Sequence, residues 1–284
     1  MQITSRFGAI CRMIKIEHSI FALPFAYAGS FLAAGGWPGL SELVLLTIAM
    51  VGVRSFAMGV NRIADLPFDR QNPRSASWPL VTGEITTWQT WRFCGFMAVM
   101  FIAACAALNG VCLALSPVAL GVAALYSYTK RFTWLCHFAL GAVIALAPVA
   151  GWLAVAPHFT IAQLLLALGV LFWVAGFDIL YSCQDLQFDR TLGLYSLPVR
   201  FGMEGAIPVA AFCHVNTVIF LFLAGLTCSL SFGWYLALAV SGGLLWWQHH
   251  IVNSDDMDSV RKAFALNGPI SVLLFIGTVL GVFF

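Results

Sequence analysis

Long apolar stretches separated by short polar segments dominate this chain of 284 residues. A helix needs roughly 20 apolar residues to cross the hydrocarbon core of a bilayer, and nine stretches come close to that length. They lie at 18–36, 41–60, 90–109, 111–128, 134–154, 160–182, 207–228, 230–250 and 264–284. The pattern predicts an all-α, polytopic membrane protein in which nine transmembrane helices form one domain over residues 1–284.

Charged residues gather between alternate apolar stretches. If the N-terminus is cytoplasmic, the cytoplasmic segments are 1–17, 61–89, 129–133, 183–206 and 251–263. Every Lys and Arg except Arg54 lies in these segments or at the adjoining helix ends. This distribution follows the positive-inside rule. It predicts a cytoplasmic N-terminus and a multi-pass protein of the cell inner (cytoplasmic) membrane.

Composition supports the membrane class and excludes others. The chain is 61% hydrophobic and 9% charged, whereas soluble domains are about a quarter charged. The formal net charge of +2 does not indicate a nucleic-acid partner, and none is expected. The cysteines form no CxxC pair, so neither a disulfide framework nor a zinc site is indicated. The histidines share no ligand spacing and are expected at solvated or interfacial positions.

The first acidic cluster follows the second apolar stretch. It reads Asn61-Arg-Ile-Ala-Asp65-Leu-Pro-Phe-Asp69-Arg-Gln-Asn-Pro-Arg74. Asn61 and Asp65 are four residues apart, which places them on one helical face. Pro67 is expected to break or kink the helix before Asp69.

The second acidic cluster follows the sixth stretch. It reads Asp178-Ile-Leu-Tyr181-Ser-Cys-Gln-Asp185-Leu-Gln-Phe-Asp189-Arg190. At about 100° per residue, Asp178, Asp185 and Asp189 fall within roughly 20° of one line along a helix. Carboxylates that share one face repel each other unless a cation lies among them.

Both clusters lie on the cytoplasmic side of the predicted topology, at matching points of two four-helix blocks. They are therefore expected to share one cavity. Oxygen ligands without His or Cys indicate a hard ion such as Mg²⁺, and the neighbouring basic residues indicate a substrate that carries phosphate. The alternative is a solvated loop face neutralised by arginines, which fits one isolated acid better than two symmetric clusters.

Arg54 is the one basic residue deep within an apolar stretch. A charge at that depth is costly and marks a candidate functional residue. Arg54 precedes Asn61 by seven residues, which places it on the same helical face and about 10 Å further into the membrane. It either pairs with a buried acid or binds an anionic group of a substrate.

The two acidic motifs resemble those of the UbiA superfamily of intramembrane aromatic prenyltransferases. The shared features are N-x-x-x-D-x-x-x-D followed by N-P-R, a second D-x-x-Y-x-x-x-D-x-x-x-D, and the segment Tyr126-Ser-Tyr-Thr-Lys130-Arg131. The resemblance implies two Mg²⁺ ions that bind the diphosphate of a polyprenyl donor. The implied metal ligands are Asp65, Asp69, Asp178, Asp185 and Asp189, of which the first four are expected to carry catalysis. Asn61, in the first motif, is expected to bind substrate.

The resemblance also implies substrate contacts. Arg74 and Lys130 would bind diphosphate oxygens, and Arg131 and Tyr181 are further candidates for contact with substrate. Arg54 would face the carboxylate of an aromatic acceptor, where a bidentate contact orients the ring.

Two positions depart from the family pattern. Arg62 stands where the family usually has Asp after the Asn, and Trp78 stands where an Arg usually precedes Pro-Leu. The second departure is expected to affect how the loop 70–84 closes.

The acceptor is predicted from closer resemblance. Segments that begin at Lys15 and Gly176, and one that ends at Trp134, are similar to bacterial 4-hydroxybenzoate polyprenyltransferases, a branch that includes MqnP of menaquinone synthesis. This resemblance favours 1,4-dihydroxy-6-naphthoate as the acceptor, with 4-hydroxybenzoate of ubiquinone biosynthesis as the alternative. An ion-coupled transporter is an alternative of another class, but it would place essential acids near the membrane midplane.

Overall fold

The computed structural model of the chain describes every residue except 1, 16–21 and 253–256. All regular structure in the described residues is helical, which confirms the all-α prediction. The helices are α1 Gln2–Ile14, α2 Leu23–Ala34, α3 Leu40–Asp69, η2 Pro73–Ser75, α4 Thr87–Leu108, α5 Gly110–Thr129, α6 Cys136–Val155, α7 Ile161–Ser182, η3 Cys183–Asp185, α8 Leu186–Thr191, α9 Leu197–Thr227, α10 Phe232–Ile251, α11 Met257–Ala265 and α12 Asn267–Phe283.

Seven helical stretches in the described part of the chain are long and apolar enough to cross a membrane. They contain α3, α4, α5, α6, α7 with α8, α9, and α11 with α12. The other two predicted spans correspond to α10 and to α2, an apolar helix of 12 residues. The predicted start of the first span, at residue 18, lies outside the described residues. The protein is an integral membrane protein.

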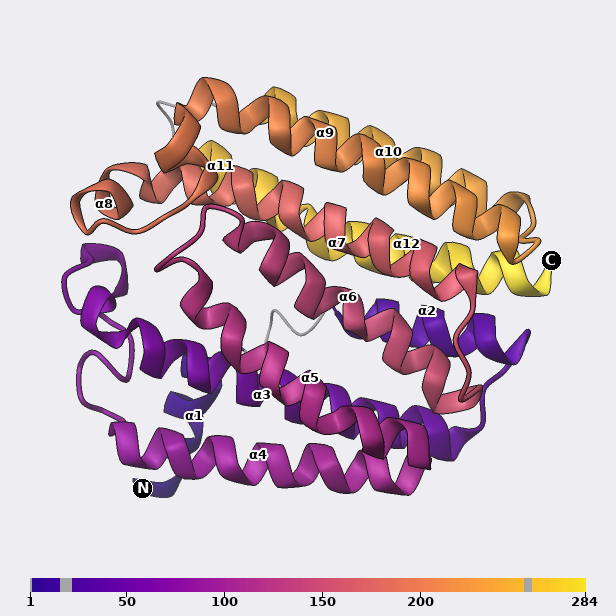
Figure 1. Cartoon of the computed structure of the whole chain (residues 1–284), viewed down its shortest axis with the longest axis horizontal. Coiled ribbons are helices and arrows are strands. Elements are labelled where there is room, and N and C mark those ends of the chain that lie inside the picture. The colour runs from indigo at the N-terminus through magenta and orange to yellow at the C-terminus, as the bar shows by residue number, and fades with distance from the viewer. Residues whose placement is uncertain (1, 16–21, 253–256) are drawn as a thin grey trace.

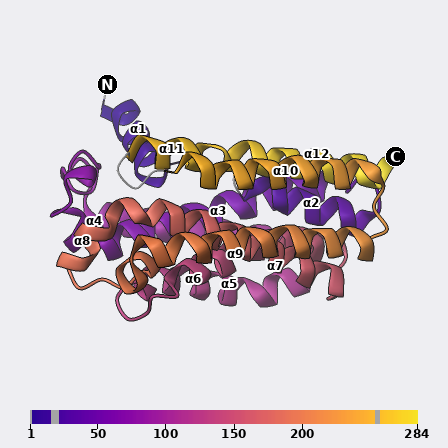
Figure 2. The same ribbon diagram turned by 90° about the horizontal axis from the view of Figure 1, so that it is seen from above.

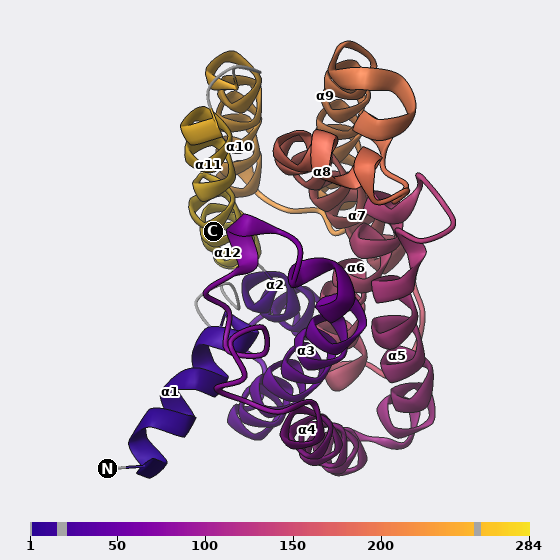
Figure 3. The same cartoon turned by 90° about the vertical axis from the view of Figure 1, so that its left-hand side faces the viewer.

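The long helices run side by side along the longest axis of the molecule (Figures 1 and 2). One end of the bundle carries α8 and the connection between α3 and α4, and the C-terminus lies at the opposite end (Figure 1). Figure 3 looks onto the first end, where these two segments lie nearest the viewer. The two acidic clusters, far apart in sequence, therefore reach the same end of the bundle.

Large buried side chains and small residues together hold the bundle. Trp173 of α7 and Trp234 of α10 are fully buried in the main core. Helices α2 and α6 approach backbone to backbone: a Cβ atom at Gly29 would collide with the carbonyl of Pro148, and one at Gly151 with that of Ala26. Small residues allow such close packing without requiring polar contacts.

The structure corrects three predicted helix courses. Helix α3 continues through Pro67 to Asp69, so the predicted break was wrong. Helix α7 ends at Ser182 and a 3₁₀ turn follows, which changes the angular phase of the second cluster. Helix α9 begins at Leu197, ten residues before the predicted start, with a kink at Gly202 (φ 69°).

Candidate active site

The two acidic clusters meet at a cavity of about 220 Å³. All the predicted site residues except Arg54 and Asp178 line it, namely Asn61, Asp65, Asp69, Arg74, Lys130, Arg131, Tyr181, Asp185 and Asp189. Its other charged lining residues are Lys15 and Arg62. Four carboxylates and five cationic side chains thus line one cavity. Such a lining suits an anion bound together with metal cations, because the cationic side chains can contact the anion and the carboxylates can contact the metal ions.

One wall of the cavity is the last part of α3. Asn61 Nδ2 donates to Asp65 Oδ2 at 2.9 Å, so the predicted contact between residues four apart is present. Because the helix continues, Asp69 extends the same face by one more turn. Its backbone carbonyl accepts from Ser75 Oγ at 2.9 Å, which ties the following loop to the helix end.

The opposite wall is formed by the end of α7, η3 and α8. Arg74, carried across from the loop after α3, donates from Nη2 to Asp185 Oδ2 at 2.8 Å and from Nη1 to the Tyr181 hydroxyl at 3.1 Å. Lys130 Nζ lies 2.8 Å from Asp189 Oδ2. Arg74 and Lys130, the two residues predicted to bind diphosphate, are thus each paired with a carboxylate of this wall.

Lys130 lies directly after α5, and its surroundings favour the charged form of its ammonium group. Burial lowers the pKa of Lys130, but the ion pair with Asp189 and the nearby Asp185 together raise it above the ordinary lysine value. The side chain is therefore positively charged at neutral pH. It is ready to hold an anionic oxygen that approaches the α8 wall.

Asp178 lies apart from the cavity lining and pairs with a histidine that the sequence reasoning missed. His137 Nδ1 lies 2.7 Å from Asp178 Oδ2, and the Leu197 backbone N–H donates to His137 Nε2 at 3.3 Å. Because Nε2 accepts, Nδ1 carries the proton and donates to the carboxylate. His137 is 2% exposed and His214 is 4% exposed, so neither is solvated, as the sequence had allowed. His214 Nδ1 lies 2.9 Å from His249 Nε2, and only packing in three dimensions reveals these partners.

Two predicted substrate contacts have protein partners. Arg54 Nη2 donates to the Lys15 carbonyl at 3.3 Å. Arg131 Nη2 donates to the Ala64 carbonyl, and its guanidinium lies over the ring of Tyr128. Arg131 therefore ties the α5–α6 connection to α3 while it lines the cavity.

The carboxylates do not form a ready-made metal cage. No group of three or more His, Cys, Asp or Glu side chains within the described ranges could hold a metal ion. The acids instead form two pairs, Asp65 with Asp69 on α3 and Asp185 with Asp189 on the other wall. Mg²⁺ is usually held by one or two carboxylates and completed by phosphate oxygens and water. The oxygen donors present fit that ion together with a diphosphate.

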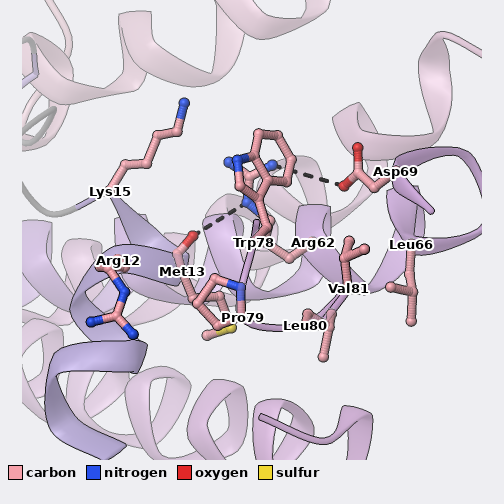
Figure 4. Close-up of a pocket in the computed structure, with 10 residues that line it drawn as sticks. All are labelled: Arg12, Met13, Lys15, Arg62, Leu66, Asp69, Trp78, Pro79, Leu80 and Val81. Atoms are coloured by element: carbon pink, nitrogen blue, oxygen red, sulfur yellow. Dashed lines mark hydrogen bonds and ion pairs between the residues drawn. The ribbon is translucent and has the colours of Figure 1, made fainter. Parts of the chain in front are cut away.

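Arg62 and Trp78 also line the cavity, although neither is among the predicted site residues. Both residues line a second, smaller pocket as well, which Figure 4 shows. The Arg62 guanidinium carbon lies 3.8 Å from the centroid of the Trp78 ring. The only sign in the sequence that these two residues could matter was their departure from the family pattern. Sequence alone could not show that the two departures touch.

Comparison with known proteins establishes the family. The model of the UbiA prenyltransferase family matches residues 22–283. The 4-hydroxybenzoate octaprenyltransferase of Albidiferax ferrireducens is 28% identical over 247 residues, which cover 87% of this chain and 83% of the relative. That of Photobacterium profundum is 26% identical over 278 residues, 96% of each protein. The chain therefore belongs to the UbiA prenyltransferase family, as its motifs predict.

Solved structures agree with this assignment. The apo structure of a UbiA homolog from Aeropyrum pernix K1 matches with a TM-score of 0.85 at 32% identity, over 92% of this chain and 97% of that chain. A UbiA homolog from Archaeoglobus fulgidus, solved with GPP and Mg²⁺, matches with a TM-score of 0.73 at 20% identity, over 95% and 99%. The protein is a membrane-embedded prenyltransferase.

Proposed function

We propose that this enzyme transfers a polyprenyl group from polyprenyl diphosphate to a hydroxylated aromatic carboxylic acid in quinone biosynthesis, with Mg²⁺ as its cofactor. The arrangement of the cavity carries the proposal: two carboxylate pairs face each other, with Arg74 and Lys130 between them. A diphosphate with its Mg²⁺ ions would satisfy both the acids and the cations of such a cavity.

We favour 4-hydroxybenzoate as the acceptor. Relatives that match along most of the chain are named 4-hydroxybenzoate octaprenyltransferase, and they favour this alternative over the naphthoate that segment similarity predicts. Both acceptors carry a carboxylate and an electron-rich hydroxylated ring. The same chemistry therefore serves either acceptor, and ubiquinone-type synthesis is the better supported of the two.

The chain's own residues support a simple course of reaction. Arg74 and Lys130 hold diphosphate oxygens, and bound Mg²⁺ would add Lewis-acid neutralisation of the leaving group. The allylic C–O bond breaks with its electron pair leaving on diphosphate, and the aromatic faces of Phe68, Tyr181 and Phe188 line the cavity in which the cation forms. The acceptor ring then forms a C–C bond, and its proton passes to a carboxylate or to the departing diphosphate.

The membrane topology belongs to the same proposal. We infer nine spans, with α2 and α10 counted, and a cytoplasmic N-terminus, a topology in which the cavity lies at the cytoplasmic face of the cell inner membrane. The basic residues gather on that side of the sequence pattern. A polyprenyl tail would then enter from the lipid while the polar acceptor enters from the cytoplasm.

A reconstituted assay tests the proposal. Purified protein in lipid receives polyprenyl diphosphate with 4-hydroxybenzoate or 1,4-dihydroxy-6-naphthoate, with Mg²⁺ or with EDTA. We expect prenylated 4-hydroxybenzoate and stoichiometric pyrophosphate with Mg²⁺ only. Product with the naphthoate alone would move the enzyme to menaquinone synthesis. No product and no pyrophosphate from folded protein would contradict the proposal and favour the transporter alternative.

Replacing Arg54 with Ala is expected to raise the acceptor KM about tenfold or more while the donor KM changes little, because a charge-assisted contact to a carboxylate contributes about 1.5–3 kcal/mol. Steady-state kinetics with each substrate varied in turn measure the effect. Arg92→Ala, near the start of α4 and exposed, is the matched control. An equal rise in both KM values would show that Arg54 acts on the fold rather than on the acceptor.

A further inference from the structure

Arg62 is enclosed by three segments of the chain near the end of α3. Its guanidinium carbon lies 3.8 Å from the centroid of the Trp78 ring, and its Nε donates to the Met13 carbonyl of α1 at 3.2 Å. Its Nη1 lies 4.0 Å from Asp69 Oδ2. Figure 4 shows the indole stacked over the guanidinium, with both dashed contacts leaving the same side chain. Arg62 is 8% exposed.

A buried guanidinium is stable only if the protein replaces its hydration. The Met13 carbonyl accepts one hydrogen bond, and the distance to Asp69 is too long for a strong one. The ring face of Trp78 supplies the remaining stabilisation, because the negative face of an indole attracts a cation, and more strongly once water is excluded. The stack is therefore the contact that fixes the plane of Arg62.

Trp78 is itself held by the turns of its loop. Its backbone N–H donates to the Ser75 carbonyl at 2.9 Å, and its carbonyl accepts from the Val81 and Thr82 amides, each at 2.9 Å. The same loop carries Arg74 into the cavity. A substitution of the Trp78 ring is therefore expected to shift the position of Asp69 through Arg62, and that of Arg74 through the loop backbone.

The other links between this loop and the helices are weaker candidates for that task. Arg12 and Glu84 form a bidentate pair at 2.7 and 2.9 Å, but their side chains are 60% and 40% exposed, and exposed pairs contribute little. Ile85 packs among the apolar residues of α1, which are not part of the cavity lining. Arg74 of the same loop reaches Asp185 on the opposite wall, and Ser75 binds the backbone carbonyl of Asp69. The Arg62–Trp78 stack adds a contact next to the Asp69 carboxylate itself.

We propose that Arg62 and Trp78 act as one positioning pair, which holds the 70–86 loop against α1 and directs Asp69 into the cavity. The two departures from the family pattern are then a single coupled change, because they stand in contact. Neither residue is assigned a chemical step. Their effect on catalysis rests on the proposed function, whereas the stack itself can be tested without any substrate.

The first test measures the loop in the metal-free protein. Trypsin cleaves after Arg70 and Arg74, both in the exposed part of the loop, at a rate that reports how often the loop opens. Trp78→Leu and Arg62→Met are each expected to speed cleavage about fivefold, the factor that loss of a partly desolvated cation–π contact gives. Trp78→Phe keeps an aromatic face and should recover most of that change. Trp88→Leu, at a tryptophan that is 69% exposed, should match the wild type.

The second test measures kcat/KM and the Mg²⁺ concentration that gives half-maximal activity. Trp78→Leu and Arg62→Met should each lower kcat/KM about five- to tenfold and raise the Mg²⁺ requirement, and the double variant should be no worse than Arg62→Met, because contacting residues are non-additive. A purely structural role would leave the Mg²⁺ requirement unchanged.

Three outcomes would overturn the proposal that the two residues act as a pair. They are losses of kcat/KM that add in the double variant, equal losses for Trp78→Phe and Trp78→Leu, and cleavage rates that do not change in the variants. If wild-type protein makes no product, the proposed function fails, and the cleavage rates still decide whether the pair exists.

Discussion

Replacing Asp65 with Asn is expected to lower kcat/KM for prenyl transfer at least about 100-fold, since disturbing even a residue that supports a metal ligand costs 10- to 100-fold. Asp65 lies on the α3 wall beside Asp69 and accepts a hydrogen bond from Asn61 at 2.9 Å. The amide removes the charge but keeps the shape. Product formation over a Mg²⁺ titration measures the loss, which high Mg²⁺ should reduce only in part.

An acid outside the cavity provides the control for Asp65. Asp258 of α11 pairs with Arg261 at 3.2 Å, and its side chain is 70% exposed. Asp258→Asn should keep wild-type kinetics and the wild-type Mg²⁺ dependence. Wild-type kinetics in Asp65→Asn as well would exclude Asp65 from the metal site.

Replacing Arg74 with Met is expected to lower kcat/KM for the donor by about 10²–10³-fold, the usual loss when one preorganised donor to a developing negative charge is removed. Arg74 bridges Asp185 and the Tyr181 hydroxyl, so its guanidinium is held in place at the cavity where the proposed function puts the diphosphate. Lysine should restore only part of the activity, because it lacks the planar fork of donors. Pyrophosphate release at varied donor concentration measures the effect, and the acceptor KM should change little.

Arg70 offers a matched control for Arg74. It has the same charge, is exposed at the end of α3 and lies outside the cavity lining. Arg70→Met should leave donor kinetics at the wild-type level. If Arg70→Met and Arg74→Met lose activity equally, the loss reflects the charge of the whole loop rather than a contact to diphosphate.

Similarity of short segments and similarity along the whole chain favour different acceptors. Three segments of the chain favour a naphthoate, whereas relatives that match along most of the chain are named for 4-hydroxybenzoate. The carboxylate that both acceptors share is the group that Arg54 is predicted to bind. Discrimination between one ring and two depends on the shape of the pocket, which no short motif encodes.

The sequence was a reliable guide where a single local rule decides the outcome. Hydropathy located every long apolar helix because the bilayer sets a minimum length and requires each backbone polar group to be satisfied within the helix. The spacing of Asn61 and Asp65 placed them on one face because an α-helix has a fixed period. Motif resemblance named most of the side chains that the fold gathers at the cavity.

The same reasoning was wrong where an α-helix gave way to a 3₁₀ turn, and where a side chain bound a residue far away in the sequence. The angular argument for Asp178, Asp185 and Asp189 assumes one continuous helix, but η3 intervenes, and Asp178 faces His137 instead. Helix α3 also continues past Pro67 to Asp69, so Pro67 does not act as the predicted helix breaker.

By itself, the sequence determined the membrane class, the helical segments, the family and most of the side chains that line the cavity, because each of these depends on composition or on spacing along the chain. The tertiary structure alone decided which carboxylate meets which cation. Arg74 with Asp185, Lys130 with Asp189, and Arg62 with Trp78 each join different segments of the chain. Such contacts depend on how the helices cross and how the loops fold back, and no local pattern encodes either.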